Sequence, residues 1–165
     1  MTTSVKFAAS RPRLRAVPAV SGSIVRPSTT GRSFFDSNVL VYTDDADSPA
    51  KRERALELFE HHRRAGSGVV SNQVLQEYFV ATTRKLGVDA GIARRKVELF
   101  ARLHLVPLSV DDLLGAVDIH RLHQVSFWDA LVVRAAVASG CTRLYSEDLH
   151  AGWRHDGLEV VNPFV

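Results

Sequence analysis

The sequence has few of the features that mark secreted, membrane-spanning or zinc-stabilised proteins. Its single cysteine, Cys141, excludes an internal disulfide and fits a reducing compartment such as the cytoplasm. No run of 18 apolar residues occurs, so we expect no membrane-spanning helix and no membrane partner. A Cys/His pattern with zinc spacing and a glycine-rich phosphate loop are both lacking. With 165 residues, 45% of them apolar, the chain is long enough for one domain with a substantial core.

Charge is distributed unevenly along the chain. Six of the 21 basic residues and none of the 18 acidic residues lie before residue 34, so the remainder is mildly acidic. The first segment is rich in Ser, Pro, Ala and Val, without helix or strand periodicity. We therefore expect a disordered basic extension over residues 1–32 and a folded domain over residues 33–165. The extension would suit an organellar transit peptide or an arm that touches nucleic acid, but also a non-functional segment absent from the mature protein.

Short apolar strands alternate with amphipathic helices in the folded part. This alternation predicts an α/β fold with a parallel sheet covered by helices on both faces. Ligands of such sheets collect at the carboxyl ends of the strands. The strands are expected at residues 33–42, 69–70, 105–108, 142–146 and 158–161, and the main helices at about 49–65, 72–86, 89–103, 109–123 and 127–139. Ser71, Asp89 and Ser126 are expected to begin three of these helices, and Ser109 with Asp112 is a capping-box-like start for a fourth.

Four acidic residues lie at the edges of these apolar segments. Asp36 and Asp148 fall at carboxyl ends of strands, whereas Glu77 and Asp129 lie on helices. Each has an ordinary explanation: a turn or helix cap for the three aspartates, and solvation for Glu77. Those explanations do not account for the joint pattern, because buried carboxylates are costly unless they are paired or coordinate a cation. If the four converge, a divalent metal would relieve their repulsion and suit phosphate chemistry. Glu147, beside Asp148, is expected to point to solvent.

Four short motifs then resemble those of PIN-domain nucleases, close to the VapC-like toxins of bacterial type II toxin–antitoxin operons. One motif alone is weak, but four in order at the expected spacing are a strong signal, and the similarity covers about residues 33–165. They are FFDSNVLVY (residues 34–42), SNQVLQE (71–77), SFWDAL (126–131) and LYSEDL (144–149).

The resemblance implies a three-layer α/β/α fold, Mg²⁺- or Mn²⁺-dependent ribonuclease activity, and a homodimer silenced by a cognate antitoxin. It assigns the metal-binding and catalytic roles to the same four acids. Ser146 and Asn38 would support that site. The basic extension departs from the family pattern, since such toxins usually begin just before the first strand.

Contacts to the RNA backbone would need basic residues near the acids. Arg84 and Lys85 are preferred because they follow Glu77 on the same helix, although a solvated helix face is an ordinary alternative. Trp128 could offer a stacking surface, but core packing or a dimer contact is the more usual role. Two other functions stay open: a non-catalytic PIN-fold module that binds RNA or protein, and a housekeeping RNA-processing nuclease.

Overall fold

The computed structural model describes residues 31–165, which form six strands and six helices. The expected extension lies outside the described residues, except for Gly31 and Arg32, and Arg32 begins the first strand. In chain order the elements are β1 Arg32–Phe35, α1 Ser37–Tyr42, α2 Pro49–Ala65, β2 Gly68–Ser71, α3 Asn72–Lys85, α4 Ala90–Phe100, β3 His104–Val106, α5 Val110–His123, α6 Phe127–Ala138, β4 Cys141–Tyr145, β5 Arg154–His155 and β6 Leu158–Val161.

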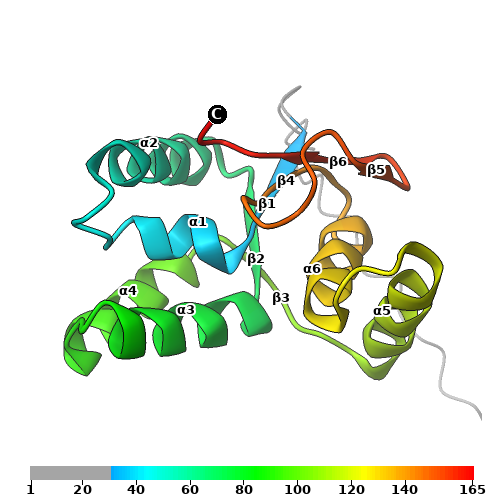
Figure 1. Ribbon diagram of the computed structural model, residues 1–165, viewed down its shortest axis with the longest axis horizontal. Helices are drawn as coiled ribbons and strands as arrows, with labels where there is room; N and C mark the ends of the chain where they lie inside the picture. Colours follow the sequence, from blue (N-terminus) through cyan, green and yellow to red (C-terminus); the bar gives the residue numbers. More distant parts are fainter. Residues whose placement is uncertain (1–30) are drawn as a thin grey trace, which may run out of the picture.

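The strands form one sheet in the order β3-β2-β1-β4-β6-β5. All neighbouring pairs are parallel except the short β5, which pairs antiparallel with β6. Helices α1 to α4 lie on one side of the sheet, and α5 and α6 lie on the other (Figure 1). The predicted three-layer α/β/α architecture is therefore confirmed, with β5 as an addition that no sequence pattern indicated.

The first apolar segment does not form the single strand predicted over residues 33–42. The strand ends at Phe35, and Ser37 begins a short helix. Asp36 separates the two, because its side chain accepts a hydrogen bond from the Ser37 amide and caps the helix. The apolar run concealed this change, since Val39 and Leu40 are fully buried on the helix just as they would be on a strand.

Hydroxyl and carboxylate caps fix where the other helices begin. Ser71, Asp89 and Ser126 cap α3, α4 and α6 as predicted. Ser109 and Asp112 form the predicted reciprocal capping box of α5. These caps place the first turns of α3 and α6 at defined positions beside the sheet.

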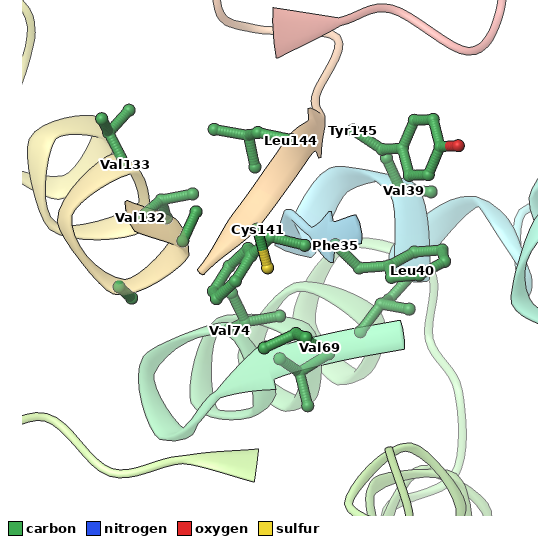
Figure 2. Close-up of a cluster of buried hydrophobic side chains, with 14 of the residues drawn as sticks. Phe35, Val39, Leu40, Val69, Val74, Val132, Val133, Cys141, Leu144 and Tyr145 are labelled. Atoms are coloured by element: carbon green, nitrogen blue, oxygen red, sulfur yellow. The ribbon is translucent and has the colours of Figure 1, made fainter. Parts of the chain in front are cut away.

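The core fills both faces of the sheet (Figure 2). Phe35 and Leu144 from neighbouring strands are fully buried, and Val74 from α3 and Val133 from α6 pack against opposite sides of the same core. Cys141 is buried within it as a free thiol. Among residues 31–165, no helix is long and apolar enough to cross a membrane.

Candidate active site

Asp36 is a buried carboxylate at the carboxyl end of the central strand β1. Its side chain is only 6% exposed. One oxygen accepts the Ser37 amide hydrogen bond at 2.6 Å, and the other accepts hydrogen bonds from Ser146 Oγ at 2.7 Å and Asn38 Nδ2 at 3.1 Å. The position follows from the sheet, because the Asp36 amide donates to the Tyr145 carbonyl of neighbouring β4. The carboxylate is therefore held rigidly between two strand ends.

Asn38 joins Asp36 to Asp148. Its amide nitrogen lies 3.0 Å from Asp148 Oδ2, 3.1 Å from Asp36 Oδ2 and 3.4 Å from Ser146 Oγ. Ser146 is fully buried, and its hydroxyl also accepts the amides of Asp148 and Leu149 at 3.3 Å each. Both predicted supporting residues thus contact the carboxylates, and Ser146 orients the loop that carries Asp148.

Glu77 reaches the same region from α3. Its Oε2 accepts a 2.8 Å hydrogen bond from Ser37 Oγ, and its Oε1 accepts one of 2.7 Å from Gln73 Nε2. Gln73 is 5% exposed and also donates to the Trp128 carbonyl of α6 at 3.3 Å. The sequence reasoning missed Ser37 and Gln73. Ser37 directly follows Asp36, and Gln73 lies one helical turn before Glu77; these positions in the sequence could have identified both residues.

Asp129 lies at the start of α6 and is engaged differently. Its amide donates to Ser126 Oγ at 3.1 Å, and the same hydroxyl donates to its carboxylate at 2.7 Å. The structure thus realises the capping interaction that was its ordinary alternative. The side chain has no hydrogen bond to the other three acids among the described residues, although Gln73 ties the neighbouring Trp128 to α3. Three acids are bridged into one network, and the fourth lies on an adjoining helix end.

The electrostatics of the network centre on Asp36. The pKa of Asp36 is raised to about 6, chiefly by burial; the hydrogen bonds from Ser146 and Ser37 oppose this shift, and the charges of Glu77 and Asp148 add to it. No Lys or Arg within residues 31–165 forms an ion pair with Asp36. Its negative charge is therefore poorly compensated by the protein.

The donor set can be compared with what a divalent cation requires. All donors are oxygens, which matches Mg²⁺, and the uncompensated Asp36 charge favours a cation. However, no three His, Cys, Asp or Glu side chains in the described part of the chain are grouped closely enough to form a ready cation site. The four acids are therefore not packed as one cluster. The arrangement fits an ion that keeps several water ligands and takes few from protein, as Mg²⁺ does.

The predicted RNA contacts, Arg84 and Lys85, are exposed at the C-terminal end of α3. Neither forms an ion pair with any residue of the described range. Many other cations are engaged with acids, among them those of the ion pairs Lys51–Glu147, Arg54–Glu57, Arg63–Glu60, Arg64–Glu60, Arg94–Glu98 and Lys96–Asp44. The two cations on α3 thus remain free for an anionic ligand.

Glu147 was expected to point to solvent, but the structure contradicts this prediction. It forms an ion pair with Lys51 and accepts a 2.5 Å hydrogen bond from the Tyr42 hydroxyl. Lys51 Nζ also lies 4.6 Å from the centre of the Tyr42 ring. The expectation failed because Lys51 is distant in sequence. The ion pair fastens the loop of Asp148 to α1 and α2.

Comparisons with known proteins agree with the fold. The sequence model of the PIN domain family matches residues 33–151. The fold is similar to the crystal structure of Mycobacterium tuberculosis VapC20, described as a sarcin-ricin loop cleaving toxin. That similarity has a TM-score of 0.60 at 22% sequence identity and covers 70% of this chain and 89% of the other. No curated protein sequence matches the chain.

Proposed function

The chain belongs to the PIN domain family, and from this premise we propose that it is a divalent-metal-dependent endoribonuclease, with residues 33–165 as the nuclease domain. We further propose that it is the toxin of a toxin–antitoxin pair and acts in the cytoplasm. The fold it shares with a sarcin-ricin loop cleaving toxin supports this reading.

The observation that carries the proposal is the state of Asp36. A carboxylate that is 6% exposed, lacks an ion pair among the described residues and faces the charges of two further acids is unfavourable unless a cation is present. Capping of α1 does not require this cost, because an uncharged side chain such as Asn could accept the Ser37 amide hydrogen bond. A reaction that requires a bound cation would explain why a buried, charged carboxylate is present at this position.

Asp36 and Asp129 are the proposed direct ligands of Mg²⁺ or Mn²⁺, with Glu77 and Asp148 acting through water or orienting the attacking water. When a cation is bound, the chemistry it supplies is neutralisation of phosphodiester charge and acidification of a water molecule. Ser146 and Asn38 fix the orientation of the Asp36 carboxylate. Ser37 and Gln73 do the same for Glu77.

Arg84 and Lys85 are the proposed contacts to the RNA backbone. They lie two helical turns after Glu77, on the same helix, and they are exposed without an acidic partner in residues 31–165. Phosphate contacts of this kind make binding salt-dependent and independent of sequence. Their replacement by Gln should therefore weaken all RNA substrates alike and reduce the salt dependence.

A cognate antitoxin and a homodimer are the proposed protein partners. Both derive from the similarity to VapC-like toxins rather than from a particular contact in this chain. Growth arrest on induction, relieved by co-expression of a small neighbouring gene, would establish the toxin role. Normal growth together with defined cleavage of a precursor RNA would instead identify a housekeeping nuclease.

The test of the catalytic proposal is incubation of the purified full-length chain with RNA in Mg²⁺, in Mn²⁺ and in EDTA. We expect cleavage with either metal, none in EDTA, and none from Asp36→Asn protein in metal. Asp47→Asn is the matched control, because Asp47 is an exposed acid outside the network. RNA binding without cleavage under all conditions would identify a non-catalytic binding module and overturn the proposal.

A further inference from the structure

Trp128 presents its indole ring to solvent at the first turn of α6. Its side chain is 62% exposed, so the core packing that is usual for tryptophan does not apply. Its backbone, by contrast, is fixed, because the carbonyl accepts the hydrogen bond from buried Gln73. A large, flat aromatic surface therefore projects from a fixed backbone position beside the carboxylate network.

A groove of about 550 Å³ separates this ring from α3. One stripe of α3 supplies the rest of its lining, since residues spaced three, four and seven apart share a helix face. Glu77 lies at the end nearest the other acids, small apolar side chains follow, and cations close the far end. The lining residues are Gln73, Gln76, Glu77, Val80, Ala81, Arg84, Lys85 and Trp128.

Along the groove, an acidic end, an apolar middle and a basic end follow one another, and this order suits single-stranded RNA. An exposed ring next to Val80 and Ala81 offers a flat apolar slot, which suits a nucleobase. Arg84 and Lys85 lie at the end away from the acids and suit a backbone phosphate. A base inside a duplex cannot enter such a slot, because it is already paired and stacked on its neighbours.

We propose that Trp128 is a stacking platform for an unpaired nucleobase adjacent to the scissile phosphate, with the neighbouring phosphate held by Arg84 and Lys85. This inference deepens the proposed ribonuclease function and rests on it. It assigns a preference for single-stranded or looped RNA to Trp128, a residue outside the acidic network. Stacking is tolerant of base identity, so the platform sets strandedness rather than sequence.

The principal rival for this surface is a second copy of the chain, since exposed tryptophans also occur in protein interfaces. The groove is less suited to that role. It combines an acid of the catalytic network with two cations that have no acidic partner in the described residues, and burial of such charges against a protein requires matching ones. RNA supplies phosphates and bases together.

The test uses full-length Asp36→Asn protein in the presence of Mg²⁺, because we expect this variant to bind RNA without cleaving it. The chain has only two tryptophans, and the second, Trp153, is half-buried against His123 and His155. A short single-stranded oligoribonucleotide of mixed sequence should quench the fluorescence of Trp128. Trp128→Phe should abolish the quenching yet retain most of the affinity, and Trp128→Ala should weaken binding about 5- to 100-fold.

Two further probes separate stacking from charge. An abasic ribose-phosphate oligomer of equal length should bind the Asp36→Asn and Asp36→Asn/Trp128→Ala proteins alike, and duplex RNA should cause little quenching. Leu114→Ala is the matched control, because Leu114 is 60% exposed on α5 and outside the groove. Its affinity for the single strand should be unchanged.

The opposing results are distinct. Equal affinity of the Trp128→Ala and parent proteins for the single strand, while wild-type protein cleaves RNA, would overturn the platform alone. Absence of both binding and cleavage would overturn the ribonuclease function together with it. A lower molar mass of Trp128→Ala protein in light scattering would show a contact between copies and overturn the stacking role.

Discussion

The Ser146 hydroxyl donates a 2.7 Å hydrogen bond to the Asp36 carboxylate, joining residues 110 positions apart at the ends of β1 and β4. Both side chains are buried, and Ser146 also accepts backbone amides of the loop that follows. One hydroxyl thus couples the central carboxylate of the network to the segment that carries Asp148.

Asp36→Asn should abolish cleavage and stabilise the fold. The folded-state pKa is raised from 3.8 to about 6, so ionised Asp36 destabilises the protein at pH 8 by roughly 3 kcal/mol at most. This destabilisation shrinks as the pH falls through 6, because Asp36 is protonated at a higher pH in the folded protein than in the unfolded chain. Urea unfolding should show a gain for Asp36→Asn at pH 8 and a smaller one at pH 5, with Asp47→Asn unchanged. An equal gain at both pH values would contradict this account.

Ser146→Ala should impair cleavage without unfolding the protein. A buried hydrogen bond to a charged group is worth about 1.5 to 3 kcal/mol, so we expect roughly a 10- to 100-fold loss of rate. The loss has a signature, since removal of this donor raises the pKa of Asp36 further and shifts the pH–rate profile upward. Ser139→Ala serves as control, because the Ser139 hydroxyl donates to the Ala135 and Ala136 carbonyls of α6 and has no hydrogen bond to any of the four acids among the described residues. A reduced rate with an unshifted pH profile would indicate a merely structural effect.

Lys51→Met should loosen the loop that carries Asp148. The substitution keeps an unbranched side chain against the Tyr42 ring but removes the ion pair with Glu147. We expect faster amide hydrogen exchange over residues 147–150 and a loss of activity of about 2- to 5-fold, within the range of a partly exposed ion pair. Arg64→Met removes an exposed ion pair on the same helix and should change neither. Unaltered exchange in Lys51→Met protein would show that the loop is fixed by Ser146 and Asn38 alone.

His62 should make the fold sensitive to acid. Burial lowers the pKa of His62 to about 4, and its ring nitrogens lie 2.7 Å from Ser67 Oγ and 3.2 Å from Tyr145 OH. As the pH falls, the histidine is protonated at a higher pH in the unfolded chain than in the folded protein. The free energy of unfolding that neutral His62 contributes is therefore fully present above pH 6.5 and is lost as the pH drops towards 4. Protonation of Asp36 opposes this trend in the same range, and the effect is best measured in Asp36→Asn protein.

The matched comparison is Asp36→Asn against Asp36→Asn/His62→Gln. Gln can donate and accept hydrogen bonds but does not titrate. Between pH 7 and pH 4.5, the first protein should lose about 2 kcal/mol more unfolding free energy than the second. Parallel pH dependence of the two proteins would show that His62 is solvated when protonated.

The sequence predicted the architecture because local patterns carried it. Strand and helix alternation, together with the caps Ser71, Ser109 and Ser126, placed most elements within a few residues. The failure at residues 36–42 arose because Val39 and Leu40 are buried in either conformation, so periodicity could not reveal the helix. The antiparallel β5 has only two residues, too few for any pattern.

The site was predictable only in part. Position relative to strand ends predicted Asp36 and Asp148 as neighbours, the resemblance to PIN-domain nucleases added Asn38 and Ser146, and the structure brings the four together. Contacts that depend on side-chain reach between elements were not accessible, as the Lys51–Glu147 pair shows. For the same reason, the sequence left open whether Asp129 stays with its own cap, as the structure shows, or joins the network.

Gln73 is a positioning residue that should act through both Glu77 and Trp128. Its amide nitrogen donates to both, and its Oε1 is buried without a partner among the described residues. Gln73→Leu removes the donor while keeping a similar volume. We expect roughly a 10-fold loss of cleavage and a changed Trp128 emission, because the start of α6 is released from α3.

Gln73→Glu separates positioning from simple packing. It places a carboxylate one helical turn from Glu77, where like charges repel and the pKa of the pair rises. The ratio of its activity to that of the wild type should therefore increase as the pH falls from 8 to 6, since one proton would restore a donor between the two groups. Gln76→Glu adds the same charge to exposed α3 surface without a hydrogen bond to Glu77, and its ratio should stay flat. If the two activity ratios change with pH in the same way, the added charge acts on RNA binding in general, and Gln73 does not specifically position Glu77.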